Sequence, residues 1–557
     1  MQYSVFSIQY KKRNKTNDPL AFHTEYEIRH TAYDSHTEYG IQNTKYFHSH
    51  ARGVTVVLVL AFMGIFAMLT ASIAGYVFQQ GKYGRAISAR EQALHIAEAG
   101  LEYYKWWLGR QASSVLTTGV GLVSPYTYAV NDPEGGTLGS AVITATPALQ
   151  CGTVQWIDLE SRGTSNASAA FPRTLLARYM KPSVAEYANL YNSTVWIGST
   201  NSAIGPQHAN NGFRMDGWSN STISSSIPQV YCDGSSGSLG CDGVSPNPSP
   251  GWKNGVFGLS STTALWQYPI PAVDFPGMAL NLPTLKGYAA ISGIMLNPTS
   301  VTRIGIQQGS AFPTVGGVET SGFHLVFKSD GTADIYRVTA TNSESASPAT
   351  PVRSYNLMYP QAFPANGWKY TYPVIATEVF VANVSIPSSC ALIYSEAKTW
   401  IDGTVSGKVA LIAADTGSFV PDIILNNNIS YTTNDGSSGL TAVAEGSIKL
   451  GLVVPDTLSV RGIFVAQTGS YSRDHYISYP RSYLPASYDQ YIVRTLLNVT
   501  GTVVSNLRVA VCYGSGGPCA SGFNNRNNAY DRILAFSPPP FTPAISPDYK
   551  LMLWREQ

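Results

Sequence analysis

The chain carries little charge. Charged residues occupy 13% of its 557 positions, and the formal net charge is only +2. A nearly neutral chain lacks the basic surface with which nucleic-acid-binding proteins hold phosphates, so its composition argues against a nucleic-acid partner. Its 50 glycines, 33 prolines and 34 tyrosines favour short strands and tight turns over a helical enzyme.

The sequence also lacks the short motifs that mark common enzyme classes. It contains no GxxxxGK[ST] phosphate loop, no HExxH, no GxSxG elbow and no GxGxxG after a strand. His208 and Asp216, joined by Arg214, are the best acid–base candidates, although such residues more often satisfy backbone groups at turns. A carbohydrate-cleaving cleft would need paired carboxylates, but the spacing selects no pair among Asp402, Asp415, Asp422 and Asp435. We therefore predict no enzymatic activity and no cofactor.

Cysteines are few, and all six lie beyond residue 150. Cys232 and Cys241 flank a Gly/Ser-rich loop, and Cys512 and Cys519 flank another. Such spacings predict two local disulfides in an oxidising compartment; free thiols or metal ligands are the alternative. Zinc sites usually bring CxxC pairs or clustered histidines, so we expect no metal site. Cys151 and Cys390 remain as a pairing with little to support it.

One hydrophobic segment stands out. Residues 54–78, VTVVLVLAFMGIFAMLTASIAGYVF, contain no charge. A helix of about 20 apolar residues spans a bilayer, and this segment is too long for a cleaved secretory signal, although a buried core helix is the alternative. Basic residues outnumber acidic ones before it, and Arg52 lies at its edge. The positive-inside rule then places the N-terminus in the cytoplasm and the rest outside, anchored in a bacterial cytoplasmic membrane.

The helix is expected to continue past the membrane, because no proline occurs from Gln79 to Arg110. Apolar residues recur there at steps of three and four: Leu94, Ala97, Leu101, Tyr104 and Leu108. This stripe predicts a helix whose second half packs one face on a globular region.

The junction before the helix resembles that of type IV pilins. Arg52-Gly53 directly precedes the uncharged helix, and IAEAGLE (Ile96 to Glu102) resembles a stretch of PilX-like minor pilins. The resemblance implies that prepilin peptidase cuts between Gly53 and Val54, and that the partners are other pilin subunits and the pilus assembly machinery. Major pilins usually carry Glu at the fifth mature position, where this chain has Leu58, and the 53-residue leader is unusually long.

The outer region is expected to be β-rich. Segments 139–149, 153–163 and 173–180 alternate apolar and polar residues, which predicts an antiparallel sheet packed on the helix. Segments within 399–470 follow one another at intervals typical of parallel β-helix coils, with Asn426–Asn428 at a turn; a β-sandwich is the alternative. The stretch 322–338, GFHLVFKSDGTADIYRV, predicts a hairpin that turns at Asp330-Gly331.

Further segments resemble pilin-like proteins of this kind: GPQHANNGFRMDG (205–217), and a closing tail of NAYDRILAFSPPPFTP (528–543) followed by YKLMLWRE (549–556). Within that tail, Pro538–Pro540 cannot occupy a central strand and are expected to cap the end of the solenoid. Six tryptophans are candidates for stacking on surface carbohydrate, with core packing as the commoner alternative: Trp106, Trp107, Trp196, Trp218, Trp252 and Trp266.

The predicted fold class is α+β and mostly β: a long transmembrane and amphipathic helix, a pilin-like antiparallel sheet, then a parallel β-helix with insertions. The expected parts are a cytoplasmic leader, the helix, the sheet, first coils, an inserted block, further coils and a C-terminal cap: 1–53, 54–112, 113–185, 186–270, 271–365, 366–480 and 481–557. The predicted function is that of a minor or tip component of a type IV pilus-like assembly, acting in adhesion or assembly. A permanently anchored surface protein and a polysaccharide-degrading enzyme are the alternatives.

Overall fold

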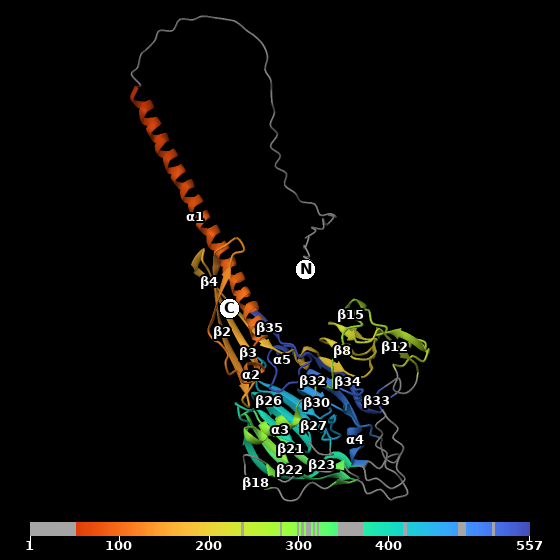
Figure 1. The fold of residues 1–557 in the computed structure, drawn as a ribbon. Coiled ribbons are helices and arrows are strands. Elements are labelled where there is room, and N and C mark those ends of the chain that lie inside the picture. The colour runs from red at the N-terminus through yellow and green to blue at the C-terminus, as the bar shows by residue number, and fades with distance from the viewer. Residues whose placement is uncertain are drawn as a thin grey trace, which may run out of the picture. The chain divides into compact units, whose positions relative to one another are not determined.

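The computed structural model describes residues 52–234, 239–278, 281–297, 322–343, 371–415, 420–476, 486–514 and 518–557, with four two-residue strands between 300 and 319 (Figure 1). Most of the predicted leader, residues 1–51, lies outside the described residues. The chain divides into two compact units, Met1–Gln79 and Gln80–Gln557. The described chain is mostly β, with a long N-terminal apolar helix and antiparallel sheets.

Helix α1 (Arg52–Leu108) is 57 residues long. In the first unit its side chains from Val54 onward are exposed. In the second unit one face becomes buried, because small residues there let a sheet approach the helix closely. A Cβ added at Gly100 would lie 2.5 Å from the Ala141 Cβ, and one at Gly163 would collide with the Ala93 carbonyl. Close helix–sheet packing therefore depends on these two glycines.

A five-stranded antiparallel sheet packs on the buried face of α1. Its order is β1 (Tyr126–Asn131), β2 (Thr137–Gln150), β3 (Thr153–Ser165), β4 (Ser168–Met180) and β35 (Lys550–Glu556). Burial alternates along the middle of β2 and β3, as expected where one face meets the helix and the other meets solvent. The C-terminal strand β35 thus returns to pair with β4. Glu556 pairs there with Leu175, which lies 381 residues earlier in the chain.

Most of the remaining strands pair in parallel ladders. The longest ladder runs through β16 (Ile294–Asn297), β24 (Leu392–Ser395), β26 (Lys408–Ala413), β28 (Gly439–Ala444), β30 (Thr457–Ala466), β32 (Val493–Ser505), β5 (Asn189–Tyr191), β8 (Gln207–Ala209), β11 (Ile223–Ser225) and β15 (Trp266–Gln267). A second ladder runs through β21 (Gly322–Phe327), β25 (Lys398–Val405), β27 (Ile423–Tyr431), the first halves of β30 and β32, and β34 (Ser521–Ala529).

Shorter parallel ladders complete the stack. One joins β27 to β29 (Ile448–Leu450) and β31 (Tyr471–Arg473). Another joins β6 (Val195–Ile197), β9 (Phe213–Met215) and β14 (Val256–Phe257), and a third joins β7 (Ser202–Ala203) to β10 (Trp218–Ser219). Apolar side chains stack in register between the ladders, as in the column Ile393, Leu411, Ala442, Phe464 and Val503. This column forms part of the largest buried core.

The long ladder is discontinuous in sequence where β5 pairs with β32, a place that we call the β5–β32 junction. Asn189 lies beside Val503 there, so the strands that follow the sheet extend the stack made by the C-terminal strands. In Figure 1 the yellow strand β8 accordingly lies near the blue strands β32 and β34.

The predicted hairpin is present: β21 pairs antiparallel with β22 (Thr332–Ser343), and Gly331 adopts a positive φ of 84° at the turn. Strand β23 (Thr371–Ser385) continues this sheet. A second hairpin joins β12 (Gln229–Cys232) to β13 (Gly251–Asn254). The remaining elements are α2 (Ser113–Thr118), α3 (Leu282–Ile291), α4 (Asp489–Ile492), α5 (Arg532–Phe536), β17 (Ser300–Val301), β18 (Ile306–Gln307), β19 (Thr314–Val315), β20 (Val318–Glu319), β33 (Cys512–Tyr513), and the 3-10 turns η1 (Val184–Glu186), η2 (Thr263–Leu265) and η3 (Ala486–Tyr488).

Two local expectations differ from the structure. Asn426–Asn428 lie within strand β27, not at a turn; the register with β25 shifts there, so a bulge bends the strand. The proline-rich tail does not close an end of the ladders. The Phe541 N–H donates to the Gln155 Oε1 of β3, and the Thr542 hydroxyl bonds that of Thr441 in β28. The tail therefore lies between the antiparallel sheet and the side of the long ladder.

Candidate functional site

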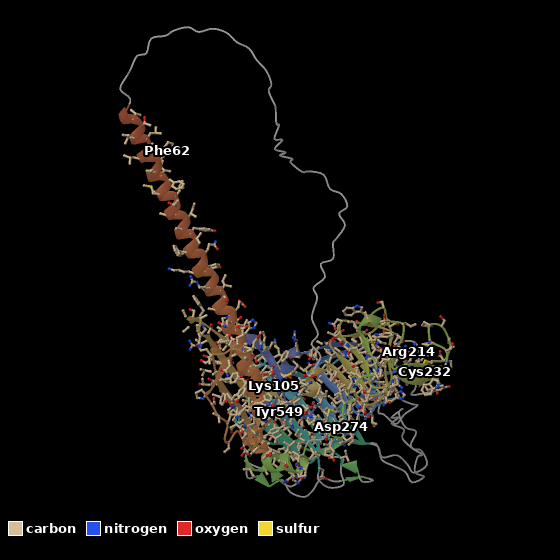
Figure 2. All side chains as sticks on the ribbon, turned by 45° about the horizontal axis from the view of Figure 1, so that its top comes forward. Phe62, Lys105, Arg214, Cys232, Asp274 and Tyr549 are labelled. Carbon is tan, nitrogen blue, oxygen red and sulfur yellow. A yellow bond between two sulfur atoms is a disulfide. The ribbon has the colours of Figure 1, made fainter. Side chains whose placement is uncertain are left out.

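The apolar half of α1 is the first functional feature. It is long and apolar enough to cross a membrane, and its most hydrophobic stretch is not buried against any described part of the chain. Gly53 and Val54, the predicted cleavage junction, lie in the first turn of the helix. Figure 2 labels Phe62, whose side chain is 64% exposed. Water penalises such a continuous apolar surface.

The amphipathic half of α1 holds the predicted stripe. Ala97, Leu101, Tyr104 and Leu108 are at most 1% exposed and pack on the antiparallel sheet, while Leu94 is partly buried at the edge of the same cluster. The Tyr104 hydroxyl donates to the Val123 carbonyl at 2.5 Å, and burial raises the pKa of Tyr104 to about 12. Ala93 and Ile96 are also buried; their positions follow the same spacing, which sequence reasoning did not extend to them.

All six cysteines form disulfides. Cys232 bonds to Cys241 and Cys512 to Cys519, each closing a short loop. Cys151 bonds to Cys390 and ties the turn after β2 to the segment before β24. Sequence proximity pointed to the two local pairs, whereas only the packing of the sheet beside the ladders brings Cys151 and Cys390 together.

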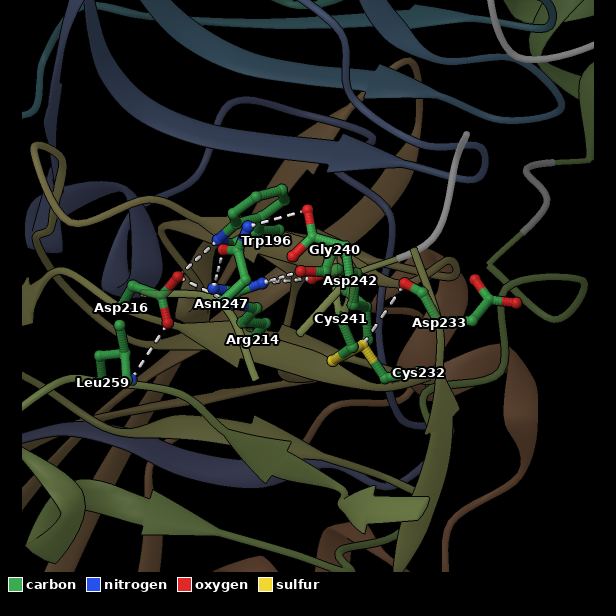
Figure 3. Close-up of polar contacts among 11 residues, drawn as sticks. Trp196, Arg214, Asp216, Cys232, Asp233, Gly240, Cys241, Asp242, Asn247 and Leu259 are labelled. Atoms are coloured by element: carbon green, nitrogen blue, oxygen red, sulfur yellow. Dashed lines mark hydrogen bonds and ion pairs between the residues drawn. A yellow bond between two sulfur atoms is a disulfide. The ribbon is translucent and has the colours of Figure 1, made fainter. Parts of the chain in front are cut away.

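Arg214 is the centre of a buried polar cluster beside the Cys232–Cys241 disulfide (Figure 3). Its guanidinium, in a side chain that is 1% exposed, forms an ion pair with Asp216 at 2.8 Å. It also donates to the carbonyls of Leu239 and Gly240 and to the Asn247 Oδ1. A buried cation is costly unless it is paired and fully hydrogen-bonded, and these contacts meet most of that requirement.

The same cluster fixes one tryptophan. Asp216 accepts a hydrogen bond from the Trp196 indole N–H at 2.8 Å, and the Arg214 guanidinium carbon lies 4.2 Å from the Trp196 ring centroid (Figure 3). A Cβ added at Gly240, where φ is 73°, would lie 2.6 Å from the ring. The disulfide loop thus holds Trp196 in a single orientation.

The predicted acid–base pair is not assembled as a dyad. His208 lies in the long ladder, where its ring bonds the Ser224 hydroxyl at 3.0 Å and the Asn210 Oδ1 at 3.1 Å. Burial lowers the pKa of His208. Asp216 binds Arg214 and Trp196 instead, and within the described residues no hydrogen bond or ion pair joins it to His208.

The four aspartates considered above as a carbohydrate-cleaving pair each contact a different partner. Asp402 bonds His324 at 3.1 Å, and Asp422 bonds Lys449 at 3.2 Å. Asp435 caps its own turn through Ser437, and the Asp415 N–H donates to Glu445. Within the described ranges no group of three or more His, Cys, Asp or Glu side chains is placed to hold a metal ion.

Some of the six tryptophans pack against the core, and others are exposed to solvent. Trp107 and Trp266 pack against buried clusters, whereas Trp218 and Trp252 are 51% and 67% exposed. Trp252 lies on the β12–β13 hairpin beside the exposed Tyr231, with ring centroids 5.6 Å apart. Trp106, also exposed, is covered by the Arg110 guanidinium at 4.2 Å.

A cavity of about 370 Å³ opens at the β5–β32 junction. It lies there because β6, which follows β5, pairs with β9 and, in the part of the chain that the structure describes, with no strand on the C-terminal side. Its lining comes from two distant segments, 191–202 and 508–528: Tyr191, Thr194, Val195, Trp196, Ile197, Asn201, Ser202, Arg508, Val509, Ala510, Val511, Cys512, Tyr513, Gly514, Arg526 and Asn528. Sequence reasoning missed this site, because no local motif joins the two segments.

No protein-family model matches the chain, and no curated protein matches it either. Among solved structures, it is similar to the competence-associated pilin ComZ from Thermus thermophilus, at 13% sequence identity and a TM-score of 0.27. The match covers 84% of this chain and 97% of that one.

Proposed function

We propose that this chain is a pilin-like surface protein, anchored in the bacterial cytoplasmic membrane by α1 and acting as a minor or tip component of a type IV pilus-like assembly. The observation that carries the proposal is the division of α1 into two halves. Residues 54–78 are uncharged and exposed, whereas the stripe from Ala97 to Leu108 is buried under an antiparallel sheet. A helix with one half for lipid or sister helices and one half for its own head suits assembly in a membrane.

The parallel ladders support a second part of the proposal. Successive passes of the chain through β24–β25, β26–β27 and β28–β29 contribute strands to the same ladders in the same direction. We propose that these passes are coils of a parallel β-helix, displayed outside the cell on the pilin-like sheet. An experimental structure in which β26 and β28 belong to separate facing sheets would instead establish the β-sandwich alternative.

The role that we propose for this displayed region is adhesion or assembly, without catalysis. A head this large would crowd its neighbours if repeated along a filament, which favours a tip or initiating position. The predicted acid–base residues His208 and Asp216 are engaged in separate structural contacts, so they give the polysaccharide-degrading alternative no support.

The decisive experiment determines the N-terminal residue of the protein in cells with and without prepilin peptidase. We expect a mature chain that starts at Val54 only where the peptidase is present. Gly53→Leu should block this processing, whereas Gly64→Leu is a matched control, because Gly64 lies in the same helix with open space around it. An uncleaved leader in both strains would refute entry into the pilin pathway and leave a permanently anchored surface protein.

A further inference from the structure

The cavity at the β5–β32 junction contains a cation where the ladder would normally place an apolar side chain. In the register of β32 with β34, Arg526 pairs with Leu497 and Asn528 pairs with Val499. Leu497 and Val499 are core residues, exposed by only 1% and 5%. Partners in a parallel ladder face the same side, so Arg526 and Asn528 leave their strand on the same side as these core residues. They stay in contact with solvent because the cavity opens beside them.

The lining of this cavity carries positively charged side chains. Its described lining includes two arginines, Arg508 and Arg526, and neither an aspartate nor a glutamate. Within the described residues no carboxylate forms an ion pair with Arg526. The Arg526 side chain is exposed and lines the cavity, so an anion can reach its guanidinium. A guanidinium presents a planar set of donors that matches a carboxylate.

The lining also contains aromatic rings, one of which is held in place by its neighbours. Trp196 belongs to the lining, and its ring is held by Asp216, Arg214 and Gly240 of the disulfide loop. Tyr191 and Tyr513 add further rings. The face of an aromatic ring carries partial negative charge, so it attracts the C–H groups on the flat side of a sugar ring. A ring already fixed by its neighbours loses little entropy when a ligand binds.

We propose that this cavity binds a sugar that carries a carboxylate, as a unit of an acidic surface glycan. Arg526 and Arg508 would hold the carboxylate, Trp196 would stack on the sugar ring, and the Asn201 and Asn528 amides would bond its hydroxyls. The proposal deepens the adhesive role proposed above and rests on it for the display of this face outside the cell.

The size and charge of the cavity favour such a sugar over a nucleic acid. Its volume of 370 Å³ falls within the range of about 300–1,000 Å³ that is usual for small-molecule sites. Nucleic acids are held mainly by a track of cations along their phosphates, whereas this chain is nearly neutral and the cavity offers two arginines.

The test is isothermal titration of the full chain in detergent micelles with defined probes. The methyl glycosides of glucuronic, galacturonic and N-acetylneuraminic acid are the acidic probes; methyl glucoside, inorganic phosphate and a thymidine oligonucleotide are the comparisons. We expect at least one acidic sugar to bind, with the neutral sugar at least roughly tenfold weaker, because it cannot form the charge-assisted bonds. No binding of any acidic sugar, or binding of phosphate or the oligonucleotide alone, would overturn the proposal.

Variants separate the site from the general charge of the surface. Arg526→Gln should weaken binding of the acidic sugar roughly tenfold or more, and Arg526→Lys should restore part of it, because lysine keeps the charge without the planar donors. Arg162→Gln is the matched control, since Arg162 is an exposed arginine on β3 far from the lining residues in sequence. Equal affinity for wild type and Arg526→Gln, with both variants folded by circular dichroism, would refute the site.

Failure here is distinguishable from failure of the pilin proposal. Leader processing at Gly53 and exposure of the head on intact cells do not depend on the cavity. A processed and displayed chain that binds no acidic sugar would remove the glycan site and leave the pilin-like role. A chain that binds the sugar but keeps its leader would do the reverse.

Discussion

The antiparallel sheet on α1 and the parallel ladders bury their strands in different ways. In the sheet, β1 to β4 follow one another in sequence, and each pairs with the next through a short turn. One face meets the helix and the other meets solvent, so buried and exposed residues alternate along the middle of β2. In the long ladder, by contrast, β28 is covered on both faces, and all six of its residues are buried.

The two regions also differ in how far apart their contacts lie in sequence. A strand of the ladders pairs with one from another pass of the chain, and at the β5–β32 junction Asn189 meets Val503. A local pattern can specify the sheet, whereas the ladders depend on contacts that form only when distant segments meet. The Cys151–Cys390 disulfide joins the two regions covalently. Its contribution to the free energy of unfolding therefore tests how far the stability of each region depends on the other.

The largest effect is expected from removing that disulfide. Cys151→Ser with Cys390→Ser opens a loop with a sequence separation of 239, and the chain-entropy model gives a loss of about 5 kcal/mol in the free energy of unfolding. Cys232→Ser with Cys241→Ser, which opens a loop with a separation of 9, should cost about half as much. Denaturant unfolding under non-reducing conditions measures both. An equal or larger loss for the short loop would show that the long-range link matters little.

The next effect concerns the contact between the sheet and α1. Gly163→Ala should lower the free energy of unfolding by about 3 kcal/mol, because the new methyl group would collide with the Ala93 carbonyl and force the helix backbone away. Gly287→Ala is the control: Gly287 lies within helix α3 with open space around it, so alanine should be neutral or slightly stabilising. Thermal unfolding followed by circular dichroism compares the two. Similar midpoints would contradict the close packing of helix and sheet.

Two histidines of the ladder region should respond to pH in opposite directions. His324, 7% exposed, bonds Glu378 at 2.8 Å and Asp402 at 3.1 Å. Burial lowers its pKa, but the bonds to Asp402 and Glu378 outweigh it, and the pKa of His324 is raised. Its stabilisation is therefore complete below the unfolded value of about 6.5 and is lost as the pH rises through the folded pKa.

The pKa of His208, by contrast, is lowered by burial. Its neutral form is favoured in the fold, so stability is retained above about pH 6.5 and declines as the pH falls below that value. His324→Gln should cost about 2 kcal/mol at low pH and less at high pH, as expected for a charge-assisted hydrogen bond. Unfolding of His324→Gln and His208→Gln at pH 5 and pH 8 measures the difference. The same sign of pH dependence for both variants would refute this contrast.

The smallest effect is expected at the outer edge of the sheet. Glu556 of β35 forms an ion pair with Arg173 of β4, and the two side chains are 33% and 13% exposed. Ion pairs that water still reaches contribute little, so Glu556→Gln should leave the unfolding midpoint close to that of wild type at moderate salt. Differential scanning calorimetry checks this. A large drop would mean that β35 holds the sheet through this pair more than through its strand hydrogen bonds.

Much of the helix and sheet was predictable because their signals are local. The uncharged run 54–78 and the stripe ending at Leu108 follow from spacing alone, and the alternation in 139–149 corresponds to β2. The hairpin turn at Asp330-Gly331 was predictable for the same reason, since glycine suits the positive φ found there. Asn426–Asn428 were misplaced at a turn, because a bulge within a strand leaves no distinct pattern in a run of polar residues.

The sequence by itself determined which segments are apolar, which alternate and where turns occur, because these properties depend on neighbours within a few residues. Only the tertiary structure decided that Cys151 meets Cys390, that the proline-rich tail lies beside β28, and that segments 191–202 and 508–528 together line a cavity. Arg526 illustrates the reason. It lies in an exposed polar run, and it lines this cavity because the pairing of β34 with β32 sets it on the same side as Leu497.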